Sequence, residues 1–558
     1  MRGAKSAKWV VGAAVIALAA TACSSSSDDS GNDKGSSTSA AAGASDPNGI
    51  VRAWWGDPQN PLEPANTNEV QGGKVLDMIF MDLKEYDPKT GKANLEAAQS
   101  IDTTDQQNFT IKVKPDLKFS DGTPVTAQSF VDAWNYGALL TNAQLNAYFF
   151  ADIDGYNAVH PADEKSKPTA KTMSGLKVVD DHTFTVKLSQ KFSTWPDRLG
   201  YKAFAPLPKS FFSNHAAYLK KPVGDGPYMV QSYTKGSSMK LVPNPYYTGP
   251  SKPKNGGVLL KVYTSSDAAY SDLQSGNLDV LDDIPATDLS HVKTDLNGRY
   301  LNQPAGIIQT FSFPLNQPAW NGPNGAKLRL GISEAIDRKT ITDKIFQGTR
   351  TPASDLTSPV LGAAGGYDPT LAGDTVKYNP TQAKQLIQEA GGLPGGHMTL
   401  GYNADSGSHK EWVDAVCNSI NNVLGNNKAC VGAPTGTFAD FRNQITKGEM
   451  KQPFRSGWQM DYPLIDDFLT PLYATGGSSN DSKYSNPAFD KLIKQANAEP
   501  DTTKAISLYK SAEKLLFTDM PVVPLWYQNG QAGWSSKVSN VTENAFSYPV
   551  FTEITVNK

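Results

Sequence analysis

The chain has few of the residues that mark metal, redox and nucleic-acid chemistry. Its 558 residues include three cysteines and six histidines, and no two histidines stand four residues apart on a potential helix face. Lysine and arginine total 52 against 55 acidic residues, so no basic surplus favours nucleic acid. We therefore expect no protein-built metal site, no bound cofactor and no nucleic-acid partner.

Motifs of common enzymes are missing as well. The sequence has no Gly-x-Ser-x-Gly, no His-Glu-x-x-His and no phosphate-binding loop. Ser232–Lys235 and Ser507–Lys510 fit the Ser-x-x-Lys spacing of penicillin-interacting enzymes. However, the Lys-Thr-Gly at 89–91 precedes both of them, and no Ser-Asp-Asn occurs. These absences favour a protein that is not an enzyme.

The N-terminal apolar run is too short to span a membrane. It covers Trp9–Ala20 and follows three cations, whereas a bilayer of about 30 Å needs roughly 20 apolar residues. Residues 1–22 are therefore predicted to be a secretory signal peptide. Ala20-Thr21-Ala22-Cys23 resembles a bacterial lipobox, with Ala20 where lipoboxes most often have Leu. This resemblance implies lipidation of Cys23; an ordinary secreted protein with a coincidental cysteine is the alternative.

A polar, low-complexity segment follows that cysteine. Residues 23–45 are rich in Ser, Gly, Ala and Asp without apolar periodicity, which predicts a lipidated, disordered tether. Removal of the three leader cations would change the formal net charge from −3 to −6. We expect an extracytoplasmic protein anchored to the outer face of the cell membrane through the lipid on Cys23.

The chain length and the other two cysteines indicate how the folded part is organised. A chain of 558 residues exceeds what one core usually supports, so two or three domains are expected. Cys417 and Cys430 are predicted to form a disulfide in an oxidising compartment, with two free buried thiols as the alternative.

Local patterns predict several secondary-structure elements. Residues 50–56 and 108–114 are typical of strands, and Thr126 is placed to cap a helix. Leu328–Ile341 carries apolar residues near helical spacing, which predicts one helix. Residues 380–390 and 506–517 are predicted to be amphipathic helices.

One stretch, residues 454–463, combines opposite charges with a glycine. If it is extended, Arg455, Gly457, Gln459 and Asp461 share one side, with the end Cα atoms roughly 20 Å apart. A cation and an anion then bracket a gap that could receive a short zwitterionic molecule such as a peptide. The alternative is that both charges are solvated or paired elsewhere.

Several blocks in order resemble one family. The sequence is similar to family 5 solute-binding proteins of ABC transporters, which include oligopeptide-, dipeptide- and nickel-binding receptors. The matching blocks are 117–130, 222–228, 244–249, 273–279, 328–338, 380–391, 484–490 and 523–525.

The resemblance implies an α/β fold of the type II periplasmic-binding-protein kind. It would have two lobes, a hinge and an extra domain inserted in the first lobe. The implied segments are 46–72, 220–309 and 530–558 for lobe I, 73–219 for the inserted domain and 310–529 for lobe II. The chain would then cross between the lobes near residues 310 and 530, and these crossings would form the hinge.

Arg455-x-Gly-Trp-x-x-Asp461-Tyr resembles the oligopeptide-binding branch. It implies that Asp461 binds a peptide α-amine and that Arg455 lies near its carboxylate. It also implies that the backbone of Gly457 and Gln459 pairs with the ligand as an added strand. The following loop departs from the Asp-Tyr-x-Asp-Pro of relatives, because the chain continues Tyr-Pro-Leu-Ile-Asp-Asp after Asp461.

Further ligand contacts are implied by the same resemblance. His409 matches a histidine that meets the carboxylate of longer peptides, although the chain has an extra residue before it; capping of a helix is the alternative. Tyr148 resembles a ligand-facing tyrosine. Four more aromatics are candidates to line side-chain pockets: Trp54, Trp458, Trp526 and Tyr527. Core packing is the alternative for all five aromatics.

These observations predict a monomeric substrate-binding lipoprotein that delivers short peptides to the permease subunits of an ABC importer. The alternatives are binding of another family 5 solute, namely an oligosaccharide, a nickel chelate or haem, and a receptor that senses peptides for signalling.

Overall fold

A computed structural model describes residues 45–558 except 88–90, 163–164, 264, 405–407, 437, 545 and the side chain of Ala439. The predicted signal peptide, Cys23 and the tether up to residue 44 lie outside the described residues. Among those that are described, no helix is both long and apolar enough to cross a membrane.

The described residues form a mixed sheet of eleven strands. In spatial order these are β16 (Cys430–Thr435), β15 (Met398–Asn403), β17 (Phe454–Gln459), β13 (Tyr300–Ser312), β18 (Val522–Trp534), β12 (Val280–Leu281), β2 (Ile50–Trp55), β11 (Gly257–Val262), β10 (Ser238–Pro243) and β9 (Tyr228–Thr234), with β14 (Arg350–Pro352) paired to β18. The strand predicted at 50–56 is confirmed as β2, where Val51, Ala53 and Trp55 are buried in alternation.

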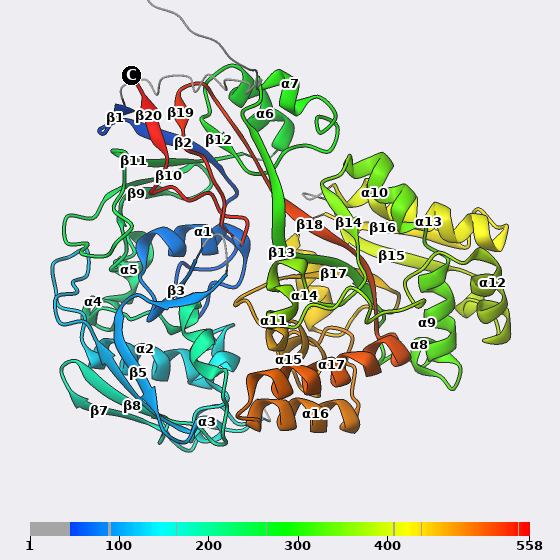
Figure 1. Ribbon diagram of the computed structural model, residues 1–558, viewed down its shortest axis with the longest axis horizontal. Coiled ribbons are helices and arrows are strands. Elements are labelled where there is room, and N and C mark those ends of the chain that lie inside the picture. Colours follow the sequence, from blue (N-terminus) through cyan, green and yellow to red (C-terminus); the bar gives the residue numbers. More distant parts are fainter. Residues whose placement is uncertain are drawn as a thin grey trace, which may run out of the picture. The chain divides into compact units, whose positions relative to one another are not determined.

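Two long strands join the flanks of this sheet (Figure 1). β13 and β18 have 13 residues each and pair antiparallel. Their register shifts between Pro304 and Ile307 and between Gln309 and Thr310. Proline has no N–H for the ladder, which accounts for the first irregularity. The predicted crossings near 310 and 530 fall in these strands, while the domain boundaries stay a prediction.

Smaller sheets accompany the large one. The four-stranded sheet orders β5 (Ala98–Thr103), β6 (Asn108–Val113), β8 (Thr183–Lys187) and β7 (Leu176–Asp180). The others are β3 (Lys84–Tyr86) with β4 (Ala93–Leu95), and β1 (Ser45–Asp46) with β20 (Thr555–Asn557) and β19 (Val538–Ser539). The strand predicted at 108–114 is confirmed as β6.

Helices flank these sheets. The longer ones are α1 (Val70–Ile79), α2 (Ala127–Ala138), α6 (Ser266–Gln274), α9 (Gly325–Glu334), α10 (Arg338–Phe346), α12 (Pro380–Glu389), α13 (His409–Leu424), α14 (Phe438–Thr446), α15 (Ile465–Tyr473), α16 (Pro487–Ala498) and α17 (Thr502–Asp519). The short ones are α3 (Tyr156–Val159), α4 (Lys209–Ser213), α5 (His215–Lys220), α7 (Val292–Asp295), α8 (Pro318–Asn321) and α11 (Gly362–Gly365). The described residues also form the 3₁₀ turns η1 (Leu140–Asn142), η2 (Ala147–Phe150), η3 (Trp195–Gly200), η4 (Lys202–Phe204), η5 (Pro359–Leu361) and η6 (Pro394–Gly396).

Capping side chains set where several helices begin. Thr126 caps α2 through a capping box with Ser129, as its sequence predicts. The single helix predicted for Leu328–Ile341 is wrong, because the chain forms α9 and α10 with a break between them. Asp337 causes the new start, since its carboxylate accepts the Thr340 backbone N–H at 3.0 Å. The helices predicted at 380–390 and 506–517 are confirmed as α12 and α17.

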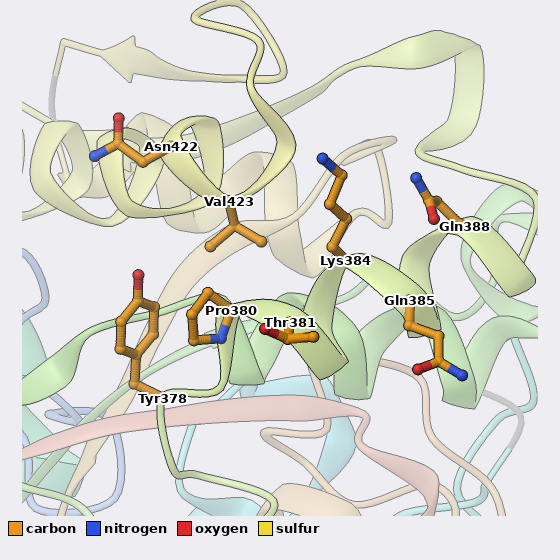
Figure 2. A pocket seen from close by; sticks show the side chains of 8 residues that line it. All are labelled: Tyr378, Pro380, Thr381, Lys384, Gln385, Gln388, Asn422 and Val423. Atoms are coloured by element: carbon orange, nitrogen blue, oxygen red, sulfur yellow. The ribbon is translucent and has the colours of Figure 1, made fainter.

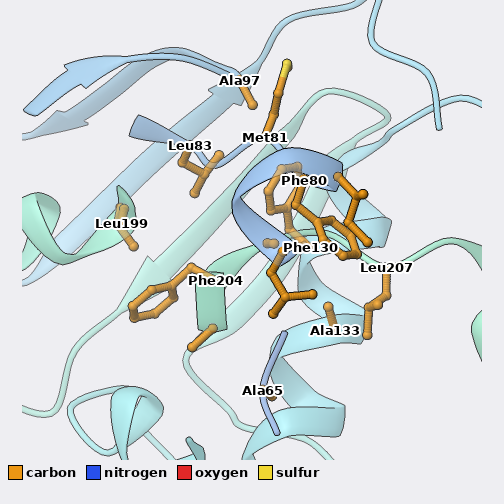
Figure 3. Close-up of a cluster of buried hydrophobic side chains, with 14 of the residues drawn as sticks. Ala65, Phe80, Met81, Leu83, Ala97, Phe130, Ala133, Leu199, Phe204 and Leu207 are labelled. Atoms are coloured by element: carbon orange, nitrogen blue, oxygen red, sulfur yellow. The ribbon is translucent and has the colours of Figure 1, made fainter. Parts of the chain in front are cut away.

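Two large clusters of buried apolar side chains form the core. The first draws mainly on residues 51–260 and the second on residues 311–526. Figure 3 shows part of the first cluster, with Phe130 of α2 among Phe80, Phe204 and Leu207. In the second cluster, a disulfide links Cys417 of α13 to Cys430 of β16. The bond ties this helix to the edge strand of the large sheet.

Candidate functional site

β17 presents one backbone edge that no strand of the described chain covers beyond Phe454. Its residues pair antiparallel with β13 from Phe454 to Gln459, while β15 meets it only at Phe454. The Met460 N–H donates to Gly306 O at 2.8 Å, so alternate residues 458 and 456 also turn their backbone groups toward β13. The N–H and C=O groups of Gly457 and Gln459 therefore point to the opposite edge, where an extended ligand could add as a strand.

The strand ends before Asp461. Extended structure ends at Gln459, and Asp461 lies in a bend. The bend is held because the Asp461 backbone N–H donates to Asp467 Oδ2 at 2.9 Å. The extended geometry considered for residues 455–461 therefore stops at Gln459, and the Asp461 side chain is positioned by α15 instead of by strand alternation.

Asp461 is a sheltered carboxylate without a cationic partner in the described residues. The Tyr148 hydroxyl donates to Asp461 Oδ2 at 3.3 Å, and the Tyr201 hydroxyl also donates a hydrogen bond to this carboxylate. No lysine, arginine or histidine of the described chain forms an ion pair with it. Burial raises the pKa of Asp461 and outweighs the two tyrosine hydrogen bonds, which lower it. A ligand ammonium group would provide the positive charge that the Asp461 carboxylate lacks.

Asp467 adds a second acid beside Asp461. Its Oδ2 accepts from Trp458 Nε1 at 3.0 Å as well as from the Asp461 backbone, while Oδ1 is buried without a partner. Burial and then the Asp461 charge raise the pKa of Asp467 well above its usual range. The two carboxyls therefore form a region that favours a proton or a cation.

The neighbouring Asp466 is different, because its charge is paired. Arg198 of η3 donates from Nη2 to Asp466 Oδ2 at 2.6 Å and from Nη1 to Asp152 at 2.7 Å. The Tyr462 hydroxyl also donates to Asp466 Oδ2, at 2.7 Å. Asp466 therefore has a structural role. Asp467 is 1% exposed, so Asp461 is the acid of this group that is accessible to a ligand.

Arg455 marks the cationic end of the site, and the neutral His409 lies near it. Arg455 Nε donates to Asn403 Oδ1 at 2.7 Å, and its guanidinium lies 5.3 Å from the Phe438 ring. His409 is the first residue of α13, where Trp412 Nε1 donates to its Nδ1 at 2.9 Å. Burial first, then the charges of Arg455 and Arg350, lower the pKa of His409 well below its usual range. The neutral ring therefore carries its proton on Nε2, which can donate to a carboxylate.

The remaining predicted aromatics are placed unevenly. Trp458 contacts the acidic end through Asp467, whereas Trp526 is 1% exposed and packs between Phe346 and Trp412. Tyr527 is also buried, and its hydroxyl donates to Asp355 O at 3.1 Å. Trp54 is half-buried beneath Lys74, whose Nζ lies 4.7 Å from its ring. The structure thus brings Trp458 and Tyr148 to Asp461, and places Trp526 and Tyr527 in the protein core.

Sequence reasoning missed three residues of this region: Tyr201, Asp467 and Arg350. The adjacent acids Asp466 and Asp467, five and six residues after Asp461, were the available signal in the sequence. Tyr201 and Arg350 stand in segments with no distinctive motif.

Separate from this region, a surface hollow of about 400 Å³ lies between α12 and α13 (Figure 2). Its lining includes Tyr378, Lys384 and Asn422 and none of the predicted site residues. No group of three or more metal-ligating side chains occurs in the part of the chain that the structure describes.

The mixed sheet with two joining strands is the α/β fold of two-lobed, type II-like solute-binding proteins, as the sequence predicts. The family model "Bacterial extracellular solute-binding proteins, family 5 Middle" matches residues 92–480, and the chain belongs to this family. The family is defined by solute binding outside the cytoplasm.

Three relatives illustrate the similarity. The chain is 27% identical over 479 residues to the periplasmic murein peptide-binding protein MppA of Escherichia coli, covering 84% of this chain and 86% of that protein. It is 28% identical to the periplasmic oligopeptide-binding protein OppA of Salmonella typhimurium, over 84% of each chain. A structure of Escherichia coli MppA matches with a TM-score of 0.80 and 24% identity, covering 91% of this chain and 98% of that one. A Haemophilus influenzae OppA complex with RPPGFSPFR has a TM-score of 0.79 and 21% identity, covering 92% and 100%.

Proposed function

We propose that this chain captures short peptides outside the cytoplasm and delivers them to an ABC importer. The observation that carries the proposal is the half-buried Asp461 carboxylate, which lacks a cationic partner in the described residues and follows the uncovered edge of β17. Moving an ion into such a site costs several kcal/mol unless it is paired, so the site favours a ligand with an ammonium group. The similarity to the murein peptide-binding protein MppA and the oligopeptide-binding protein OppA supports the same ligand class.

The two ends of β17 suit the two ends of a peptide. The α-amine would meet Asp461, with Tyr148 and Tyr201 orienting the carboxylate. The peptide backbone would pair with Gly457 and Gln459, and the carboxylate would lie toward Arg455 and His409. Main-chain pairing is common to all peptides, so this part of the affinity would not depend on the peptide's side chains.

Calorimetry with the mature chain tests the ligand class. After bound ligand is removed by unfolding and refolding, di- to pentapeptides are expected to bind with micromolar or tighter affinity, on the order of 8 kcal/mol. Oligosaccharides, nickel chelates and haem are the comparison ligands. Binding confined to one of these three classes would contradict the proposal.

Peptide binding should release a proton on the acid side of neutrality. Burial raises the pKa of Asp461 in the ligand-free site, whereas an ammonium group needs the charged form. Affinity should therefore rise with pH, by up to about tenfold per unit, until the ligand-free carboxyl is ionised. The titratable groups facing Asp461 are Tyr148, Tyr201, Asp467 and Tyr548. Calorimetry at about pH 6 in two buffers of different ionisation enthalpy counts the protons; no net release there would rule out this coupling.

We also propose that Cys23 is lipidated and holds the protein at the outer face of the membrane. The lipobox-like Ala20-Thr21-Ala22-Cys23 and the polar segment after it support this proposal. Labelling with a radioactive fatty acid should mark the natural chain and not Cys23→Ala. Equal labelling of both would contradict it.

A further inference from the structure

Arg350 is a sheltered cation whose donors have no acceptor among the described residues. Its Nε and Nη1 atoms are shielded from solvent and make no hydrogen bond, and no ion pair forms on this side chain. Its guanidinium lies 4.8 Å from the Phe346 ring centroid. A guanidinium has five N–H donors in a planar fork that matches a carboxylate, and leaving them unpaired in a buried place is costly.

A row of aromatic contacts links Arg350 to the cationic end of the site. Phe346 packs on Trp526 at 5.3 Å between ring centroids, and Trp526 packs on Trp412 at 5.5 Å. Trp412 in turn donates its indole N–H to His409. Arg350 therefore lies across this row from His409. The charges of Arg350 and Arg455 both lower the pKa of His409, which agrees with this placement.

Nearby acids do not pair with Arg350. Asp283 is close enough for its charge to influence Arg350, but it accepts from Ser266 Oγ and forms no ion pair with the guanidinium. Asp282 instead pairs with Lys74 at 2.5 Å. Burial dominates at Arg350 and lowers its pKa to about 9, so it stays cationic at neutral pH.

We propose that Arg350 binds a ligand carboxylate, as a specificity residue that acts beside Arg455 and His409. This inference rests on the proposed peptide-binding function and deepens it. The carboxylate has two possible sources: the C-terminus of a longer peptide or an acidic side chain near that end. In either case Arg350 favours peptides that carry negative charge at the end remote from Asp461.

The test compares the natural chain with Arg350→Met, which keeps an apolar contact on Phe346. Peptides of three to six residues are titrated as free acids and as C-terminal amides, and matched pairs exchange Glu for Gln near the C-terminus. In one of these two comparisons, free acid against amide or Glu against Gln, the natural chain should bind the charged peptide about 10- to 100-fold more tightly than the neutral one. Arg350→Met should lose that preference while binding the neutral peptides as before. If Arg350→Met loses the preference for free acids over C-terminal amides, the carboxylate is the peptide C-terminus. If it loses the preference for Glu over Gln peptides, the carboxylate is a side chain.

Two controls separate this role from a structural one. Arg299→Met removes another arginine, one that donates to the Trp534 carbonyl at 3.0 Å, and should leave the preference intact. The ligand-free melting temperature of Arg350→Met should not fall, because the substitution removes an unpaired sheltered charge. A fall in that temperature with an unchanged carboxylate preference would overturn the inference and point to a structural pair with Asp283. If the natural chain binds no peptide at all, the proposed function itself fails, and this inference fails with it.

Discussion

Replacing Asp461 by Asn is expected to weaken the binding of a free peptide by about 30-fold to several thousandfold, because truncating one partner of a buried charge pair costs about 2–5 kcal/mol. Asn has nearly the shape of Asp, so the Tyr148 and Tyr201 contacts can persist. The loss would then come from the ammonium group, which would be desolvated without a counter-charge. Calorimetric titration of both chains with one tripeptide measures this loss of affinity.

Asp467→Asn is the matched control for this substitution. The Asn side-chain oxygen can still accept from Trp458 Nε1 and from the Asp461 backbone, so the bend after β17 should hold. We expect a much smaller loss of affinity than for Asp461→Asn. Equal losses from both variants would mean that the two acids share the ammonium group.

Replacing Arg198 by Met is expected to destabilise the folded chain by about 3–5 kcal/mol, the usual cost of removing one partner of a buried ion pair. Arg198 is the shared partner of Asp152 and Asp466, and the Asp466 side chain is only 1% exposed. Without the guanidinium, Asp466 would keep the Tyr462 and Thr470 hydroxyls but no cation. Denaturant unfolding of the mature chain measures the change.

Lys187→Met provides the comparison. Lys187 pairs with Asp154 at 3.2 Å, but both side chains are well exposed, at 56% and 38%. Such a surface pair contributes about 0–1 kcal/mol. If Arg198→Met unfolds at the same denaturant concentration as Lys187→Met, the pairing of η3 with α15 does not stabilise the fold as described.

The sequence predicted the backbone of the site better than its side-chain surroundings. Alternation and the Arg-x-Gly-Trp-x-x-Asp-Tyr pattern located β17 and both charged ends. However, the contact between Tyr148 and Asp461 joins residues 313 positions apart, and that between Arg198 and Asp466 spans 268. Contacts of this kind depend on how distant segments of the chain pack together. Local sequence patterns do not predict such packing.

Three differences between the sequence patterns and the structure have local physical causes. Apolar spacing alone predicted one helix across 328–341, while a single capping carboxylate at Asp337 divides it. Trp526 was a candidate pocket residue, yet an aromatic in β18 can face either side, and this one enters the core between Phe346 and Trp412. An extended conformation through Asp461 was considered, but the Asp467 side chain bends the backbone there.

The central claim is that the Asp461 carboxylate receives the ligand's ammonium group. The most direct measurement is a calorimetric titration of the mature chain with one tripeptide and with its N-acetylated counterpart at about pH 7, where the α-amine of the free peptide is still charged. We predict micromolar or tighter binding of the free peptide, and binding at least about 30-fold weaker after acetylation. Equal affinities for the two peptides would contradict the account.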